Sequence, residues 1–298
     1  MTRHRVYAIV LVLALAGAAL PARADDASPD PTTHSNGFYL HSRLMPTQPQ
    51  GECPPNIDPV YQADEIVTGT DMRQRPWGFA QTLREVLVKV SGDPRLRDDP
   101  RTAPLADHAE QYVVCFAYAD MMAGIPIHDE QGTYDRPHKL TVTFDPAKID
   151  ALVASFGDKP WRGEHPIIVP VLLVHGRKPP PYILSAENSE GAEQRGAFAG
   201  AAGEFGLAVR FPSEVELGQW GTSVARFPGN VTDTRKNELI VTGTLDWNES
   251  LPGWIGAWRT RWQDKDHRWG ISGVNYDAAF RDIARGVVLL ASENGSPD

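Results

Sequence analysis

The chain has 298 residues, with 29 Lys or Arg against 38 Asp or Glu and a formal net charge of −9. An acidic surface of this size favours solubility and disfavours non-specific binding to nucleic acid. We therefore exclude nucleic acid as a partner.

The N-terminus has the three parts of a secretory signal peptide. Basic MTRHR precedes the apolar run VYAIVLVLALAGAAL, and PARADD follows with Ala22 and Ala24 as the small residues of a cleavage site. The run of about 15 residues is shorter than the roughly 20 of a transmembrane helix, and an uncleaved anchor is the alternative. We expect residues 1–24 to be removed near Ala24, which leaves 26 basic residues (29 − 3) against 38 acidic ones, or −12, and no membrane span.

Residues 25–57 are rich in Asp, Ser, Pro and Thr and predict a flexible lead-in, within which Phe38–Met45 docks locally. Cys53 and Cys115 are the only cysteines, and export places them in an oxidising compartment, so we expect a disulfide between them. The alternative is a buried Cys115 and a free Cys53. Neither cysteine lies in a C-x-x-C or beside a histidine, which disfavours a catalytic role.

Residues 58–157 predict a first unit in the order β-α-β-β-α. A strand in VYQADEIVTG precedes a helix over Trp77–Val90, whose three- and four-residue spacing predicts one buried face without Arg84 and Lys89. Gly92 is placed to end this helix in the left-handed conformation. The strands EQYVVCFAYAD and HKLTVTFDP form a hairpin with a long loop, and Asp145 caps a helix in PAKIDALVASF.

Residues 165–293 predict a second unit in the order β-α-β-meander-α. PIIVPVLLVHG has the continuous apolar pattern of a strand covered on both faces. A helix in EGAEQRGAFAGAAGEFG, a short strand in LAVRFP and a helical turn in PSEVELGQW follow. NELIVTGTLDW, GAWRTRWQ and HRWGISG form the meander, and Asn275 caps the closing amphipathic helix. The fold class is α+β, with two small units.

The segments TLREVLVKVSGDPRL, EQYVVCFAY and LTVTFDPAKIDALV, with a following W and HPIIV, resemble an exported proteobacterial family called domain of unknown function twenty sixty-six. This resemblance covers most of Val60–Leu290, and its best segments are Leu83–Leu96 and Val142–Val169. It implies a periplasmic protein of the Gram-negative envelope with two α+β units and no assigned activity. The layout of the second unit also looks like small periplasmic docking domains, an analogy of fold only.

No catalytic or metal-binding motif is present, and we assign no catalytic residue, metal or cofactor. G-x-S-x-G and H-E-x-x-H are both missing. His108 with Glu110 and the run His128–Glu130 are interpreted as solvated loops rather than metal ligands. The glycines of GAFAGAAGEFG lack a dinucleotide or phosphate fingerprint and predict close packing of a helix on a sheet. DKDH, Asp264–His267, is interpreted as a charged hairpin turn.

The stretch GAWRTRWQDKDHRWGISG predicts a hairpin with two different faces. Strand alternation directs Trp258, Thr260, Trp262 and Trp269 to one face, which we expect to cover the C-terminal helix. The other face is then a cationic spot on an acidic protein, with a solvated face balanced by nearby acids as the alternative. We predict that a partner binds at this spot, made of Arg259, Arg261, Lys265 and Arg268.

The sequence favours a non-enzymatic periplasmic module that binds an envelope partner, either a protein or an anionic envelope polymer. The alternative is a hydrolase-type enzyme whose site is assembled from distant residues. Converging acids or histidines in a deep pocket would favour the enzyme, and an open surface patch would favour binding.

Overall fold

The computed structural model describes residues 49–124, 136–178, 180–231, 235–250 and 252–297. The expected signal peptide, the segment Phe38–Met45 and His128–Glu130 lie outside these residues. Within them, the helices and two sheets confirm the α+β class. The unit boundaries 58–157 and 165–293 stay a prediction. None of the helices described has the length and apolar character needed to cross a membrane.

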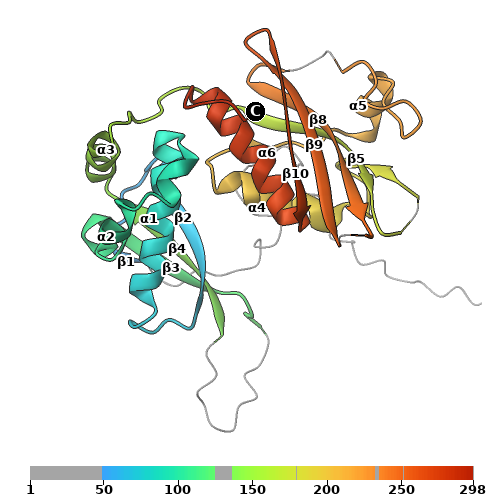
Figure 1. Cartoon of the computed structure of the whole chain (residues 1–298). Helices are drawn as coiled ribbons and strands as arrows, with labels where there is room; N and C mark the ends of the chain where they lie inside the picture. The colour runs from blue at the N-terminus through green and yellow to red at the C-terminus, as the bar shows by residue number, and fades with distance from the viewer. Residues whose placement is uncertain (1–48, 125–135, 179, 232–234, 251, 298) are drawn as a thin grey trace, which may run out of the picture. The chain divides into compact units, whose positions relative to one another are not determined.

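The first sheet has four antiparallel strands in the order β1-β3-β4-β2 (Figure 1). Helices α1 and α3 lie beside this sheet. As expected, Gly92 follows α1 with φ 71° and ends it in the left-handed conformation. The Asp145 side chain caps the start of α3 and accepts hydrogen bonds from two backbone amides, also as expected. The elements are β1 Gln50–Gly51, β2 Gln62–Thr68, α1 Arg75–Ser91, α2 Thr102–Ala106, β3 Val113–Asp120, β4 Pro137–Phe144 and α3 Pro146–Ser155.

Two residues of α1 differ from the helical pattern. Trp77, expected on the buried face, is 48 % exposed, because at this end of α1 the face toward the core is made of Gly78, Phe79 and Thr82 instead. Lys89, expected outside that face, is 8 % exposed. Its ammonium pairs with Glu85 at 2.6 Å and donates to the backbone carbonyl of Gln62 at 2.9 Å, so its charge is compensated where it lies. Gln62 belongs to β2, which is an outer strand of the first sheet. On the same strand, the backbone amide of Ile66 donates to the Glu65 carboxylate at 3.0 Å.

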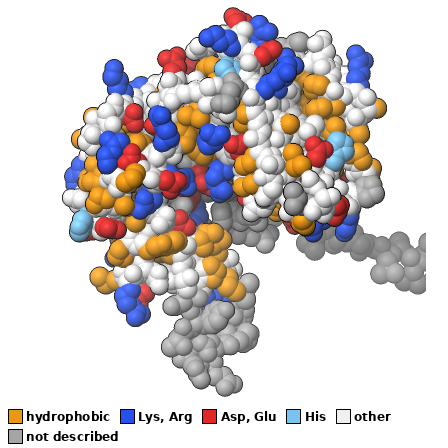
Figure 2. Space-filling view, in the orientation of Figure 1, with side chains coloured by type: hydrophobic (Ala, Val, Ile, Leu, Met, Phe, Trp, Pro, Cys, Tyr) orange, Lys and Arg blue, Asp and Glu red, His pale blue; other side chains and the backbone are white. Residues whose placement is uncertain are grey.

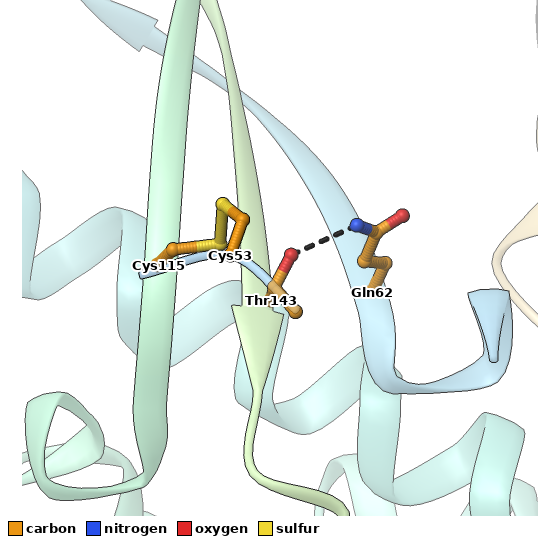
Figure 3. Close-up of a disulfide and its surroundings, with 4 residues drawn as sticks. All are labelled: Cys53, Gln62, Cys115 and Thr143. Atoms are coloured by element: carbon orange, nitrogen blue, oxygen red, sulfur yellow. Dashed lines mark hydrogen bonds between the residues drawn. A yellow bond between two sulfur atoms is a disulfide. The ribbon is translucent and has the colours of Figure 1, made fainter. Parts of the chain in front are cut away.

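The end of the expected lead-in is bound to the first sheet. Gln50 and Gly51 pair with Phe116 and Cys115, and Cys53 forms the expected disulfide with Cys115, with the Cα atoms 5.3 Å apart. Figure 3 shows this disulfide beside the hydrogen bond from Gln62 to Thr143. Flexibility was therefore the wrong expectation for this end, because a strand pairing and a covalent bond both hold it.

The second sheet has six strands, with the path β10-β9-β8-β5-β6 and β7 pairing with β5. The β5–β8 and β5–β7 pairs are parallel, and β8, β9 and β10 form the expected antiparallel meander. The elements are β5 Ile167–His175, β6 Tyr182–Ile183, α4 Ala192–Gly203, β7 Ala208–Val209, α5 Glu214–Gln219, β8 Glu238–Asn248, β9 Gly253–Trp262, β10 Lys265–Val274 and α6 Tyr276–Ala291.

Helices α4 and α6 cover one face of the second sheet (Figure 1). The Asn275 side chain caps α6 as expected, and Phe198 of α4 stacks on Phe280 of α6 with ring centroids 4.8 Å apart. Close packing through the glycines of α4 is contradicted, since a Cβ at Gly196, Gly200 or Gly203 would meet no atom within 4 Å. The buried face of α4 is instead made of Phe198, Ala201 and Ala202.

The opposite face of the second sheet is covered over β5. Val169 and Val171 pack there against Leu217 of α5 and Trp220. Ile240 of β8 and Val231 lie at the border of this small cluster. Among the described residues, no helix covers the same face over β9 and β10. We call this part, around Thr242, Arg259 and Arg268, the open face.

Candidate interaction surface on the second sheet

The β9–β10 hairpin closes through a two-residue turn. Gln263 and Asp264 have φ values of 46° and 61°, and Trp262 pairs with Lys265. Positive φ at both central positions is typical of a type I′ turn, whose twist matches that of paired strands. A charged turn over Asp264–His267 is therefore the wrong interpretation, because Lys265–His267 already belong to β10.

The tryptophans of the hairpin lie on the helix-covered face, as predicted. Trp258 and Trp269 are opposite one another and only 2 % and 9 % exposed. The indole N–H of Trp258 donates to the carboxylate of Asp282 at 3.2 Å, and that of Trp269 donates to the Asp282 carbonyl at 3.3 Å. A Cβ at Gly286 of α6 would lie 2.6 Å from the Trp269 ring, so this glycine permits the contact. The tryptophans are core residues.

Three of the four predicted binding residues share the open face. Arg259 and Arg261 alternate with buried Trp258 and Thr260, and Arg268 lies opposite Arg259 in the register. Lys265 differs, because it is an even number of residues from Trp269 and therefore belongs to the helix-covered side of the strand. The structure thus brings three of these residues to one face and places the fourth on the other.

The arginines of this face have acidic partners. Arg259 pairs with Asp266 at 2.8 Å, and Arg261 pairs with Asp264 at 3.5 Å. All four side chains are exposed, so each pair contributes little to stability, but each reduces the local positive charge. Figure 2 shows basic and acidic side chains interspersed on the displayed face of the molecule as well. The expectation of a cationic spot is therefore wrong for Arg259 and Arg261, and the alternative of a balanced face describes them.

A cleft of about 640 Å³ lies at the hairpin end of the open face. Its walls come from the ends of β8 and β9, from the turn and from the segment after the cis Phe227–Pro228 bond. Arg259 and Arg261 line it, as do residues that sequence patterns did not single out. These are Pro228, Gly229, Asn230, Val231, Glu238, Leu239, Ile240, Thr242, Thr260, Asp264 and Asp266.

Arg210 fixes one wall of the cleft. Its guanidinium makes two hydrogen bonds to Glu238, at 2.6 and 2.9 Å, and also bonds Glu216 at 3.0 Å. Burial favours a higher pKa for Glu238, but the hydrogen bonds and charge of Arg210 outweigh it and lower the pKa of this carboxyl. Glu216 also accepts from the backbone of Ser213 in a capping box at the start of α5. Arg235 also pairs with Glu216, at 3.8 Å, so two arginines balance the two carboxylates of this wall.

Possible catalytic groups are few among the described residues. His108 and Glu110 are exposed and 4.0 Å apart, which fits the solvated loop expected of them. His175 and Asp246 form a closer pair, with Nδ1 and Oδ1 2.5 Å apart, at the carboxyl ends of the parallel strands β5 and β8. No group of three or more potential metal ligands comes together in the part of the chain that the structure describes.

Residues 56–162 match a family model described as a domain of unknown function, DUF8605. The range includes the strands β2, β3 and β4 and the helices α1, α2 and α3, but not the second sheet. The resemblance to a domain of unknown function is confirmed at this level, whereas the family designation differs from the one expected. No curated protein and no solved structure matches the chain.

Proposed function

We propose that the protein is an exported, non-enzymatic module that docks an envelope protein through the open face of its second sheet. The observation that carries the proposal is the cleft of about 640 Å³ on the open face, the part of the sheet that no described helix covers. Clefts of roughly 300–1,000 Å³ hold drug-sized ligands. A cleft of this size is therefore large enough to receive a few side chains of a protein partner.

The charges of the cleft favour a protein over an anionic polymer. Arg259 and Arg261 are the basic residues of its lining, against the acids Glu238, Asp264 and Asp266. Recognition of a polyanion needs basic groups that are available to neutralise it, whereas these arginines already have carboxylate partners. A polypeptide of mixed charge and polarity matches such a lining better.

The compartment is part of the proposal. A disulfide between Cys53 and Cys115 is consistent with an oxidising environment, as are the basic, apolar and small-residue segments of residues 1–24. Together with the absence of a catalytic motif, these features support a periplasmic binding protein.

A hydrolase is the second candidate, and the His175–Asp246 pair is the observation in its favour. A carboxylate that accepts a hydrogen bond from one imidazole nitrogen leaves the other nitrogen available as a base. In that case His175→Gln would abolish turnover of a hydrolysable substrate. The docking proposal expects the same variant to retain partner binding.

The test is site-specific photocrosslinking in intact cells. A photoreactive residue replaces Ala257, which is exposed on the open face, or Ala192, an exposed alanine at the start of α4, as the matched control. We expect a defined protein adduct from position 257 that is absent from 192 and that is lost when Arg259, Arg261 and Arg268 are replaced by glutamate in a folded variant. Equal adducts from both positions, or none from 257, would contradict the proposal.

A further inference from the structure

Large exposed apolar side chains gather at one end of the first sheet. At this end β2 and β3 stop and β4 begins, and the connection of residues 69–74 joins β2 to α1 (Figure 1). Met72 in the connection is 73 % exposed, Trp77 in the first turn of α1 is 48 % exposed, and Ile66 near the end of β2 is 56 % exposed. These are three of the six large apolar side chains that are exposed among the described residues, and Figure 2 shows hydrophobic side chains at this end of the first sheet. A group of this kind marks an interaction site.

The exposed apolar residues lie on two different sides of this end. Gly78 of α1 faces the sheet, where a Cβ would lie 2.5 Å from the side chain of Leu140, and the neighbouring Trp77 is left outside this contact. Ile66 precedes Val67, which packs in the core with α1, so strand alternation places Ile66 on the opposite face of β2. Apolar surface is therefore exposed both on the helix side and on the far side of the same end.

Arginines are interspersed with these apolar residues. The stretch DMRQRPW, residues 71–77, has two arginines against one aspartate on a chain whose formal net charge is −9. Arg73 pairs with Asp71 at 2.6 Å. The guanidinium of Arg75 lies over the Phe116 ring, 4.5 Å from its centroid, and donates to the Tyr118 hydroxyl at 3.4 Å. Arg75 thus keeps a positive charge that no carboxylate of the described residues pairs with.

We propose that this end of the first sheet rests on an anionic lipid surface. We call Ile66, Met72, Arg75 and Trp77 the apolar end. Tryptophan favours the boundary between water and lipid, and arginine keeps its charged group among the headgroups while its carbon chain lies in apolar surroundings. The inference goes beyond docking through the open face and is independent of it, because all four residues belong to β2, α1 and their connection.

The two-sided arrangement favours a lipid surface over a protein partner. A protein interface needs a continuous patch with close shape complementarity. Ile66 and Trp77 instead lie on different sides of the same end. A lipid surface is fluid and surrounds an end that enters it, so it contacts both sides at once. Peripheral binding of this kind combines burial of apolar side chains with attraction between basic groups and anionic lipids, which Met72 and Arg75 supply here.

Vesicle flotation of the purified chain without residues 1–24 tests the inference. The vesicles contain phosphatidylethanolamine and phosphatidylglycerol, and phosphatidylcholine vesicles are the neutral comparison. We expect the double variant Met72→Ser, Trp77→Ser to bind the anionic vesicles about 10-fold more weakly than the wild type. The matched control Val215→Ser, Val224→Ser also removes two exposed apolar side chains, and it should bind like the wild type. Arg75→Gln should weaken binding to the anionic vesicles about 5-fold and leave binding to the neutral ones unchanged.

Quenching by brominated lipids identifies the residue that enters the surface, and it keeps the test decisive if the double variant fails to fold. We expect quenching of tryptophan fluorescence in the wild type but not in Trp77→Phe, although this conservative variant still floats with the vesicles. The inference is overturned if the wild type does not float with anionic vesicles, if both double variants lose binding equally, or if quenching persists in Trp77→Phe. A protein adduct from position 257 in cells is unaffected by any of these results, so the docking function is tested separately.

Discussion

Removal of the Cys53–Cys115 disulfide tests how the first sheet is stabilised. The bond closes a loop with a sequence separation of 62 residues. In the chain-entropy description, a loop of this length lowers the entropy of the unfolded chain by about 14 cal/mol/K, or about 4 kcal/mol at 25 °C. The native contacts beside the bond are modest, because β1 has only two residues. We therefore expect the effect to come mainly from the unfolded state.

The measurement compares the wild type with the double variant Cys53→Ser, Cys115→Ser. Urea unfolding followed by amide hydrogen exchange of β3 and β4 reports the first sheet specifically. We expect a loss of about 4 kcal/mol in the free energy of unfolding of these strands, with the amides of the second sheet much less affected. Reduced wild type is the control and should behave like the double variant. A loss below about 1 kcal/mol, with the bond shown to be present by alkylation and mass spectrometry, would refute the entropic argument.

Three further changes have defined outcomes. Gly286→Ala pushes a methyl group against the Trp269 ring and should cost about 1–3 kcal/mol in thermal unfolding, whereas Ala at open Gly200 should be neutral or stabilising. Thr260→Val keeps the side-chain shape but removes the hydroxyl that donates to the Ile240 carbonyl, and should lower the free energy of unfolding in urea by about 1 kcal/mol. Arg210→Met should lower the free energy of unfolding at neutral pH, and the difference between the variant and the wild type should become smaller as the pH falls.

The sign of the last effect follows from Glu238. Arg210 lowers the pKa of this carboxyl below its ordinary value of 4.5, so the stability from the pair is present above pH 4.5 and is lost as the pH falls through the folded-state pKa. The variant lacks this contribution at every pH. Unfolding curves of both proteins between pH 3 and 7 should therefore converge at the acid end. If the difference between the two proteins is the same at every pH, Arg210 acts through packing alone. If Thr260→Val or Gly286→Ala has the same free energy of unfolding as the wild type, the contact described for that residue is contradicted.

The two faces of the β9–β10 hairpin could be predicted because strand periodicity needs no tertiary information. Alternation predicts Trp258 and Trp269 on one face and Arg259 and Arg268 on the other, and the structure confirms this. Grouping Lys265 with the arginines by charge, rather than by its position in the alternation, predicts the wrong face for this residue. The same rule, applied through the turn, predicts the correct face.

Other features depend on contacts that a local pattern does not contain. Lys89 is buried because Glu85 and the Gln62 carbonyl compensate its charge, and helix periodicity does not include either partner. The local sequence of α4 does not show which of its small residues pack into the core and which face solvent. The cleft depends on how the ends of β8 and β9, the hairpin turn and residues 228–231 come together, so it could not be predicted from strands assigned one by one.

The side chains along β2 have a consequence for how this protein meets other chains. β2 is the outermost strand of its sheet, where exposed main-chain groups invite sheet-to-sheet aggregation. Lys89 occupies the outward carbonyl of Gln62, and Glu65 occupies the outward amide of Ile66. Self-association through this border is thereby discouraged, at the modest cost of burying one lysine. This edge of the first sheet therefore resists adding a strand of another chain, which favours the folded monomer wherever protein concentrations are high.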